Sequence, residues 1–274
     1  MPRSNPVLCG SISARPSVFG VTMHNAAYGA ADLPFVYVAF EVHDTREAVL
    51  AMRYLGIRGL GVSMPHKIQI MQYLDALDAT AERIGAVNTV VNDVGRLTGH
   101  NTDWIGALRA LQEQVDVAGK RAVVVGAGGA ARAVVYGLVK EGAQVIVYNR
   151  TVSRGEELAA DFGARFGGGL KALDSLRDYD ILVNATSVGF HAPDASVVPA
   201  AVLGEGKTVL DVVFIPPRSK LVKEAQARGG VGISGVRMLV HQAAYQFELY
   251  TGERAPFETM ERALLHKIDQ LSDE

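Results

Sequence analysis

A glycine-rich turn between an apolar run and a helical pattern limits the possible folds of this chain more than any other feature. Residues 121–125 read Arg-Ala-Val-Val-Val, a pattern typical of a buried strand, and Gly126-Ala-Gly-Gly-Ala-Ala131 follows at once. The residues from Ala130 to about Glu141 have a helical pattern. A strand, a turn with this glycine spacing and a helix, in that order, predict the phosphate-binding turn of a dinucleotide-binding domain.

Each small residue of this turn suits such a site for a structural reason. Gly126 makes the tight turn, Gly128 lets the backbone approach the pyrophosphate, and Ala131 allows helix and strand to pack closely. The start of the helix adds unpaired N–H groups and the positive end of a dipole. The alternative, a glycine-rich turn without a ligand, is disfavoured by the strand and helix beside it. The predicted cofactor contacts are Gly126, Ala127, Gly128, Gly129 and Ala130.

The end of the next strand, Gln144–Tyr148, indicates which dinucleotide binds. An NAD site usually places a carboxylate there, on the ribose 2′-hydroxyl, but this strand continues as Asn149-Arg150-Thr151, with Arg154 one turn on. A guanidinium pairs with a phosphate through two hydrogen bonds and stacks on adenine. Asn149, Arg150, Thr151 and Arg154 therefore predict NADP, the alternative being arginines that merely solvate a helix start.

The chain length and the alternation of elements predict an α/β fold of two domains. After the glycine turn, helix 153–162 and strands 181–183 and 208–212 continue the alternation, which predicts a Rossmann-type, doubly wound sheet over residues 103–236. The first hundred residues also alternate, which predicts parallel βαβ units in a substrate domain. The helical patterns 238–252 and 257–271 contain no further strand. We expect them to return to that first domain, giving residues 1–102 with 237–274.

Three local expectations in the first domain can be checked against the structure. Residues 35–40 predict a strand, and a helix is expected over 44–55 with Asp44 or Thr45 as its N-cap. A strand around 60–63 leads to Pro65 and to a helix with Ile68, Met71 and Leu74 on one apolar face.

Composition excludes several classes of function. The formal net charge of −2 and the pI of about 6.4 leave no global positive field for nucleic acid or an anionic membrane. No apolar run approaches the ~18 residues that a membrane span needs. Cys9, the one cysteine, lies in an apolar run and fits a buried side chain in a reducing cytoplasm. We expect a cytoplasmic protein, monomer or homodimer, whose partner is a small molecule.

Three further motifs lie in the first domain, and together with the glycine turn they resemble the shikimate dehydrogenase family. They are Val62-Ser-Met-Pro-His-Lys67, Gly85-Ala-Val-Asn-Thr89 and Asn101-Thr-Asp103. The resemblance continues through residues 184–189, Asp211 and 235–242, and so covers nearly the whole chain.

The resemblance implies an NADP-dependent oxidoreductase that interconverts shikimate and 3-dehydroshikimate by hydride transfer. In the family the lysine and aspartate at the positions of Lys67 and Asp103 are the catalytic dyad, a pair that suits proton transfer from a secondary alcohol. Ser63, Asn88 and Gln242 match residues that bind the ring hydroxyls. Further cofactor contacts are implied at Thr186, Ser187, Val213 and Gly235, and no metal is expected. His66 and His24 are interpreted as structural residues.

The sequence departs from the family where the substrate carboxylate is bound. Val18 and Gly20 stand in place of two serines, so a shifted loop must supply the donors. Ser13 and Ser17 are the predicted donors, Ser17 first, with Arg15 as the ionic alternative.

Other substitutions lie close to the matching motifs. Gly61 replaces an asparagine, Trp104 a glycine and Phe214 a tyrosine, so the chain is more similar to a divergent shikimate dehydrogenase-like branch. Quinate or an aminoshikimate thus remains an alternative substrate with the same mechanism. A catalytically idle NADP-binding or sensor protein is the other alternative, and intact Lys67 and Asp103 argue against it.

Overall fold

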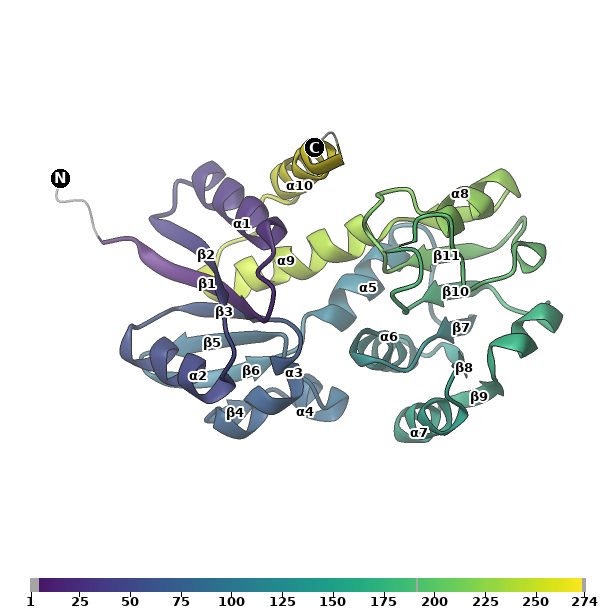
Figure 1. The fold of residues 1–274 in the computed structure, drawn as a ribbon, viewed down its shortest axis with the longest axis horizontal. Coiled ribbons are helices and arrows are strands. Elements are labelled where there is room, and N and C mark those ends of the chain that lie inside the picture. Colours follow the sequence, from purple (N-terminus) through teal and green to yellow (C-terminus); the bar gives the residue numbers. More distant parts are fainter. Residues whose placement is uncertain (1–4, 191, 273–274) are drawn as a thin grey trace. The chain divides into compact units, whose positions relative to one another are not determined.

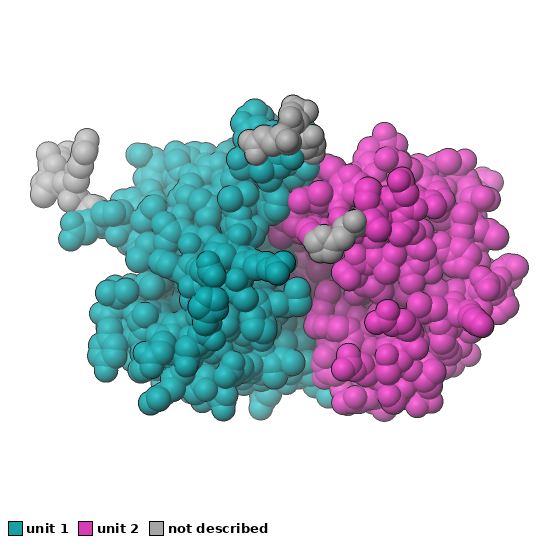
Figure 2. Space-filling view, in the orientation of Figure 1, with its two compact units in different colours: residues 1–102, 242–274 teal, residues 103–241 magenta. Residues whose placement is uncertain are grey.

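The computed structural model describes residues 5–190 and 192–272, and the chain divides into two compact units (Figure 2). The first unit comprises residues 1–102 and 242–274, and the second comprises residues 103–241. The chain therefore returns from the second unit to the first after His241, inside helix α9 (Gly235–Thr251). The sequence pattern placed this boundary after Val236.

The first unit contains a six-stranded sheet of order β2-β1-β3-β5-β6-β4. Its strands are β1 (Val7–Ser13), β2 (Phe35–Glu41), β3 (Gly59–Val62), β4 (Ala76–Leu77), β5 (Thr89–Asp93) and β6 (Arg96–His100). The expectation of parallel pairing holds for β2, β1 and β3 and for the pair of β4 with β6, whereas β5 is antiparallel to both β3 and β6. The β5–β6 hairpin turns at Val94 and Gly95, both with positive φ, and no βα crossover separates the two strands.

Helices cover both faces of this sheet (Figure 1). They are α1 (Val18–Ala30), α2 (Thr45–Tyr54), α3 (His66–Gln69), α4 (Ala79–Ile84), α10 (Phe257–Ser272) and the end of α9. Asp44 is the N-cap of α2, since its carboxylate accepts hydrogen bonds from the Arg46 and Glu47 N–H groups. Helix α10 packs against α1, so the C-terminal segment returns to the first domain as expected.

The prediction of a helix after Pro65 was wrong in the extent of the helix and in the face that is buried. Helix α3 is a single turn, and the chain continues as a 3₁₀ helix at Ile70–Tyr73. The tighter 3₁₀ winding shifts the angular spacing, so Ile70 is fully buried while Ile68 is 70% exposed. Met71 and Leu74 still pack on the core formed by α2 and the sheet.

The second unit has a fully parallel sheet of order β12-β11-β10-β7-β8-β9. Its strands are β7 (Arg121–Val125), β8 (Gln144–Tyr148), β9 (Arg165–Gly168), β10 (Ile181–Asn184), β11 (Thr208–Asp211) and β12 (Val231–Ile233). The central strands are buried on both faces, which explains their unbroken apolar runs. The prediction of a doubly wound α/β sheet is confirmed, although the sequence pattern missed the short edge strands β9 and β12.

Helices and 3₁₀ turns cover the two faces of the second sheet. Helices α5 (Asp103–Gln112), α6 (Gly129–Lys140) and α7 (Val152–Phe162) pack in series. The core on the other face is closed by α8 (Lys220–Ala227) and by 3₁₀ turns at Leu170–Ser175 and Ala200–Val202. The carboxyl ends of β7 and β10 meet where the strand order reverses, the usual ligand-binding edge of such sheets.

A buried cluster of aromatic rings fills the space between the first sheet and helices α1 and α9. His24 is fully buried, and its ring stacks on that of Tyr37 at 4.3 Å between centroids. Asn25, its neighbour, accepts from the Tyr37 N–H at 2.9 Å and donates to the Tyr37 carbonyl at 2.8 Å. His24 is therefore a structural residue, as interpreted from the sequence.

The burial of His24 couples stability to pH. Burial lowers the pKa of His24 to about 4 from its usual 6.5, so the folded state holds a neutral ring. The unfolded chain takes up a proton below pH ~6.5 while the fold does not, so His24 contributes stability above that pH and loses it towards about 4.

We expect His24→Phe, which cannot be protonated, to remove about 3 kcal/mol of the stability that the protein loses between pH 7 and pH 4. Urea unfolding followed at several pH values measures this. His43→Phe, at an exposed histidine, serves as the control and should follow the parent protein. Parallel pH curves for His24→Phe and the parent would contradict the assignment.

Candidate active site

The glycine turn of the second unit leaves its backbone open on one side. Gly126 has φ +119°, and a Cβ there would lie 2.9 Å from the Ala185 carbonyl oxygen, so only glycine fits between β7 and β10. A Cβ at Gly128 or Gly129 would meet nothing within 4 Å. Gly128 is the N-cap of α6 and has no side chain to cap the helix, so the first N–H groups of α6 are available to an anion.

The loops after β10 and β11 lie beside this turn and are held by a buried carboxylate. Asp211 accepts from Asn184 Nδ2 at 2.9 Å, Ser219 Oγ at 2.6 Å and the Val213 N–H at 3.1 Å. Burial raises the pKa of Asp211, and these hydrogen bonds counter the rise. The Thr186 hydroxyl donates to Asn184 Oδ1 at 2.7 Å, so Thr186 and Val213 share one network.

Gly235 completes this group of predicted cofactor residues, and Ser187 lies exposed in the loop after Thr186. A Cβ at Gly235 would lie 2.5 Å from the Val212 carbonyl oxygen, so α9 starts against the loop that carries Val213. The second unit thus brings Gly126, Thr186, Val213 and Gly235 to one edge of its sheet.

The residues expected to select NADP lie at the end of β8. The side chains of Arg150 and Arg154 are exposed, and Thr151 is the N-cap of α7. Asn149 Nδ2 donates to the Thr151 carbonyl at 2.8 Å, which fixes the turn between strand and helix. Within the described part of the chain, the residues from the end of β8 through Arg154 include no carboxylate, so this corner is positively charged.

In the first unit, backbone hydrogen bonds hold three predicted substrate-site segments together. The Val62 N–H donates to the Asn88 carbonyl at 2.7 Å, and the Val87 N–H donates to the Lys67 carbonyl at 2.8 Å. Ser63, Lys67 and Asn88, which are far apart in the sequence, therefore lie on adjacent segments. The Ser63 side chain is exposed, that of Lys67 is half-buried and that of Asn88 is buried.

The side chain of Asn88 is itself fixed by residues of two other motifs. Its Oδ1 accepts from the Thr102 N–H at 2.7 Å and from Thr89 Oγ1 at 2.8 Å, and its Nδ2 donates to Thr102 Oγ1 at 3.0 Å. Thr102 directly precedes Asp103, which begins α5 in the second unit and is 4% exposed. Lys67 and Asp103 belong to different units.

The remaining predicted substrate residues lie on β1, α1 and α9 of the first unit. Ser13 ends β1 and is buried, whereas Ser17 is exposed and caps α1 by accepting from the Phe19 N–H at 3.3 Å. Gln242 is half-buried on α9. Arg15, the ionic alternative, is exposed in the loop between β1 and α1.

His66 is held away from any reactive role by two hydrogen bonds. Its Nδ1 lies 2.8 Å from Thr45 Oγ1, its Nε2 lies 3.0 Å from the Val42 carbonyl oxygen, and the ring is buried. Cys9 is also buried, which raises the pKa of its thiol to about 11 and makes it a poor nucleophile.

Gln246 is a residue of this site that the sequence pattern did not reveal. It lies one turn after Gln242, is 6% exposed and donates from Nε2 to Thr89 Oγ1 at 2.9 Å. Its neighbours on α9, including Phe247 and Tyr250, are apolar core residues. Helical periodicity therefore places Gln246 among core positions without indicating its partner.

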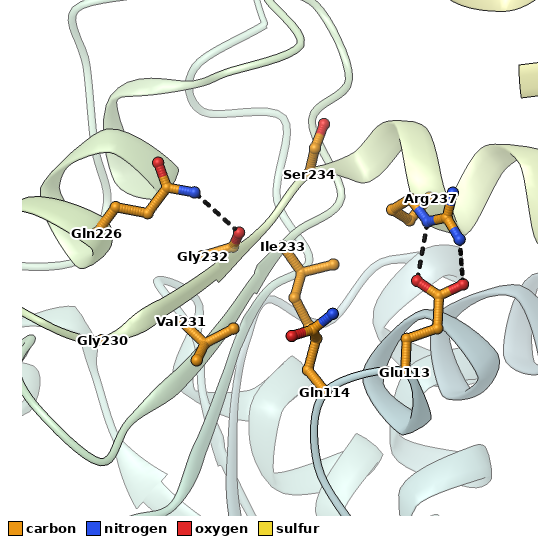
Figure 3. Close-up of a pocket in the computed structure, with 9 residues that line it drawn as sticks. All are labelled: Glu113, Gln114, Gln226, Gly230, Val231, Gly232, Ile233, Ser234 and Arg237. Atoms are coloured by element: carbon orange, nitrogen blue, oxygen red, sulfur yellow. Dashed lines mark hydrogen bonds and ion pairs between the residues drawn. The ribbon is translucent and has the colours of Figure 1, made fainter. Parts of the chain in front are cut away.

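A cavity of about 450 Å³ in the second unit is lined by a different set of residues (Figure 3). Its wall includes strand β12 and an ion pair of Arg237 with Glu113, and Gln226 donates to the Gly232 carbonyl beside it. The predicted cofactor residues are not among its lining residues. The phosphate-binding geometry of the glycine turn, rather than this cavity, therefore marks the candidate site.

The described residues contain neither a metal-binding cluster nor a helix that could span a membrane. Over residues 5–190 and 192–272, no cluster of three or more His, Cys, Asp or Glu side chains is placed to hold a metal ion. In the same residues, no helix has the length and apolar character to cross a membrane.

Three family models match successive parts of the chain. The shikimate dehydrogenase substrate binding domain matches residues 17–90, the shikimate/quinate 5-dehydrogenase model matches 108–208, and the shikimate 5′-dehydrogenase C-terminal domain matches 235–265. The matches cover both units and include segments that contain Lys67, the glycine turn and Gln242.

Known proteins resemble the chain along almost its whole length. The shikimate dehydrogenase (NADP(+)) of Methanopyrus kandleri is 44% identical over 261 residues, which cover 90% of each chain. A crystal structure of a shikimate dehydrogenase in complex with NADP⁺ has a TM-score of 0.90 and 39% identity, with 96% of both chains covered. Quinate dehydrogenase from Corynebacterium glutamicum in complex with NAD has a TM-score of 0.89 and 32% identity, covering 96% of this chain and 100% of the other. With this identity and coverage, the chain belongs to the shikimate dehydrogenase family.

Proposed function

We propose that this protein is an NADP-dependent shikimate dehydrogenase, which interconverts shikimate and 3-dehydroshikimate. The observation that carries the proposal is the convergence of Ser63, Lys67 and Asn88 through the Val62–Asn88 and Val87–Lys67 backbone hydrogen bonds. The second unit supplies an open glycine turn of the kind that binds a dinucleotide. The relative from Methanopyrus kandleri carries the same activity in its name.

The residues of the second unit fit NADP. The open backbone at Gly128 and Gly129, at the start of α6, suits a pyrophosphate, with Ala127 and Ala130 on either side. Arg150 and Arg154 suit the 2′-phosphate, with Asn149 and Thr151 fixing the turn, and the loops of Thr186, Ser187, Val213 and Gly235 complete the site. When bound, the nicotinamide accepts a hydride from the alcohol carbon or returns it to the ketone.

Lys67 and Asp103 are proposed to handle the proton at the reacting oxygen. Alcohol oxidation releases a proton from the hydroxyl as the hydride leaves its carbon. The Lys67 ammonium stabilises the charge that develops on this oxygen, and the Asp103 carboxylate orients the lysine and the substrate. In this proposal the first unit, residues 1–102 with 242–274, binds the substrate, and the second unit, residues 103–241, binds the cofactor.

Hydrogen-bonding side chains of the first unit are proposed to hold the substrate. Ser63, Asn88 and Gln242 contact the ring hydroxyls, while Ser13 and Ser17 contact the carboxylate. The Ser17 oxygen accepts from the Phe19 N–H as the cap of α1, so its hydroxyl proton remains able to donate to a carboxylate.

Two finer points belong to the same proposal. We place the protein in the cytoplasm, which suits a single cysteine that is buried as a thiol. Its partner is a shikimate-like small molecule rather than a nucleic acid, and the chain acts as a monomer or homodimer.

Quinate is the second candidate substrate, because a quinate dehydrogenase matches the chain over 96% of its length. We expect the purified protein to oxidise shikimate with NADP faster than quinate with either cofactor, measured by absorbance of the reduced nicotinamide. The positively charged corner at Arg150 and Arg154 is the reason to expect NADP, and the similarity to relatives named as shikimate dehydrogenases is the reason to expect shikimate. Faster turnover of quinate, or no turnover of shikimate, would overturn the proposed substrate.

Lys67→Ala and Asp103→Ala should each lower kcat by at least about a hundredfold, because the dyad acts in the transition state. The dissociation constant for NADP should change little, since the glycine turn and Arg150 are unaltered. Lys223→Ala, at an exposed lysine of α8, is the matched control and should keep full activity. If both dyad variants keep kcat within tenfold of the parent, the assignment fails.

Arg150→Asp should weaken NADP binding by about tenfold or more and leave NAD binding nearly unchanged, because only NADP carries the 2′-phosphate. Isothermal titration calorimetry with both cofactors checks this. Arg228→Asp, at the exposed end of α8, carries the same charge change and should alter neither affinity. An equal loss of affinity for both cofactors would show that Arg150 does not bind the 2′-phosphate.

A further inference from the structure

Strands β10 and β11 end in two buried residues, Asn184 and Asp211, which are direct partners in the parallel register. Asn184 Oδ1 accepts from the N–H of Thr186, two residues on, at 3.1 Å. Asp211 Oδ1 accepts in the same way from the Val213 N–H at 3.1 Å. Asn184 and Asp211 are each 1% exposed, so bulk water does not compete for these hydrogen bonds. Each strand therefore ends in a turn of the same kind, held by the side chain of its last residue.

A direct hydrogen bond between the two side chains joins these turns. Asn184 Nδ2 donates to Asp211 Oδ1 at 2.9 Å, and this is the same oxygen that accepts from the Val213 N–H. A backbone hydrogen bond from the Val212 N–H to the Asn184 carbonyl, at 3.0 Å, continues the sheet and fixes the ends of the strands. The N–H groups of Thr186 and Val213 lie beyond the strands and are held by the side-chain pair. The pair therefore links the parts of the two loops that follow the sheet.

The linked turns lie against two glycines that belong to the proposed cofactor site. A Cβ at Gly126 would lie 2.9 Å from the Ala185 carbonyl oxygen and 3.2 Å from Thr186 Cγ2, so the first turn contacts the glycine turn. A Cβ at Gly235 would lie 2.6 Å from the Val213 carbonyl oxygen, so the second turn contacts the start of α9. A shift of one turn against the other would therefore change the spacing of all the proposed cofactor contacts at this edge of the sheet.

We propose that Asn184 and Asp211 are positioning residues that hold the turns of Thr186 and Val213 together, so that both turns meet the dinucleotide as one rigid surface. The two residues have different tasks, since the Asn184 amide supplies the N–H and the Asp211 carboxylate supplies the shared oxygen. Both act through the turns and do not touch the reacting atoms. This inference rests on the proposed function, in which Thr186 and Val213 contact NADP.

The proposed role of Asp211 requires an acceptor but not a negative charge. In Asp211→Asn the amide oxygen can take the place of Oδ1, where two N–H donors meet it, and its NH₂ group then faces the Ser219 hydroxyl, which can accept. The dissociation constant for NADP, measured by calorimetry, should stay within about threefold of the parent in Asp211→Asn and rise at least about tenfold in Asp211→Leu, which leaves the donors unpaired. Equal effects of the two substitutions would overturn the proposal.

Asn184→Asp tests the link from the other side, because it replaces the donor with an oxygen of the same size. Two carboxylates then face each other where Nδ2 now lies 2.9 Å from Asp211 Oδ1, so one of them holds a proton at low pH. Raising the pH removes this proton, and the affinity for NADP relative to the parent should fall at least about tenfold. Adding Asp211→Asn leaves one carboxylate and should abolish this pH dependence. A pH profile like that of the parent in Asn184→Asp would contradict the role. Both substitutions keep the size of the side chain and serve if Asp211→Leu does not fold.

Tyr179→Phe is the control for a general loss of stability. It removes another buried hydrogen bond of the second unit, from Tyr179 Oη to the Val202 carbonyl at 2.7 Å. We expect a lower free energy of unfolding in this variant and an unchanged affinity for NADP. A loss of affinity as large as that in Asp211→Leu would show that stability, rather than the side-chain pair, governs binding.

An NMR measurement without cofactor keeps this inference separate from the proposed activity. In full-length protein labelled with ¹⁵N-valine, the Val213 amide signal is assigned by its loss in Val213→Ile. Asn184→Asp should shift this signal and speed its hydrogen exchange, because Asn184 and Val213 share Asp211 Oδ1, while the Val209 signal from the middle of β11 stays in place. If the parent does not bind NADP, the proposed function fails and the Val213 signal still decides whether the turns are linked. An unchanged Val213 signal would overturn the inference.

Discussion

The hydrogen bond from the Thr102 N–H to Asn88 Oδ1 is the contact on which the substrate side of this protein depends. It is 2.7 Å long and buried, and it connects the start of β5 to the residue just before Asp103. The backbone of Asn88 is engaged as well, since its N–H donates to the His100 carbonyl and its carbonyl accepts from the Val62 N–H. Asn88 therefore ties β3, β6 and Thr102 together within the first unit. In the proposed mechanism, the same residue also recognises the substrate.

The cofactor side depends on a buried carboxylate in an analogous way. Asp211 is buried at the end of β11, which raises its pKa, and it is held by Ser219, Asn184 and the Val213 N–H. Burying a carboxylate without hydrogen-bond donors is unfavourable in free energy, so removing any one donor to Asp211 destabilises the loops on either side of it. In this way a polar network maintains the backbone positions that the parallel sheet brings to one edge. The open glycine turn lies at that edge, where a bound phosphate meets N–H groups rather than side chains.

Particular elements show which parts of the fold could be predicted. The strand, glycine turn and helix of residues 121–141 are local features, and the structure contains them close to the predicted bounds. The β5–β6 hairpin could not be predicted from alternation, because its turn places Val94, a β-branched residue, at φ 52°. Such a residue seldom adopts positive φ, so the two central residues of the turn lack the usual Asn-Gly or Asp-Gly pair of a two-residue hairpin. The helix after Pro65 failed for a related reason, since the change to 3₁₀ winding at Ile70 leaves no mark in the apolar spacing.

The sequence by itself determined the family, the alternation of the central strands and helices of the second unit and the candidate dinucleotide turn, because each depends on short-range spacing of small, apolar and charged residues. It also indicated Ser63, Lys67, Asn88 and Asp103 as residues of interest. Only the tertiary structure decided that Gln246, 157 residues after Thr89, donates to the Thr89 hydroxyl, and that the Thr102 N–H orients the Asn88 amide. Hydrogen-bond direction depends on which donors and acceptors the packed fold brings within about 3 Å of one another. The spacing of residues along the chain does not determine which donors and acceptors meet in this way.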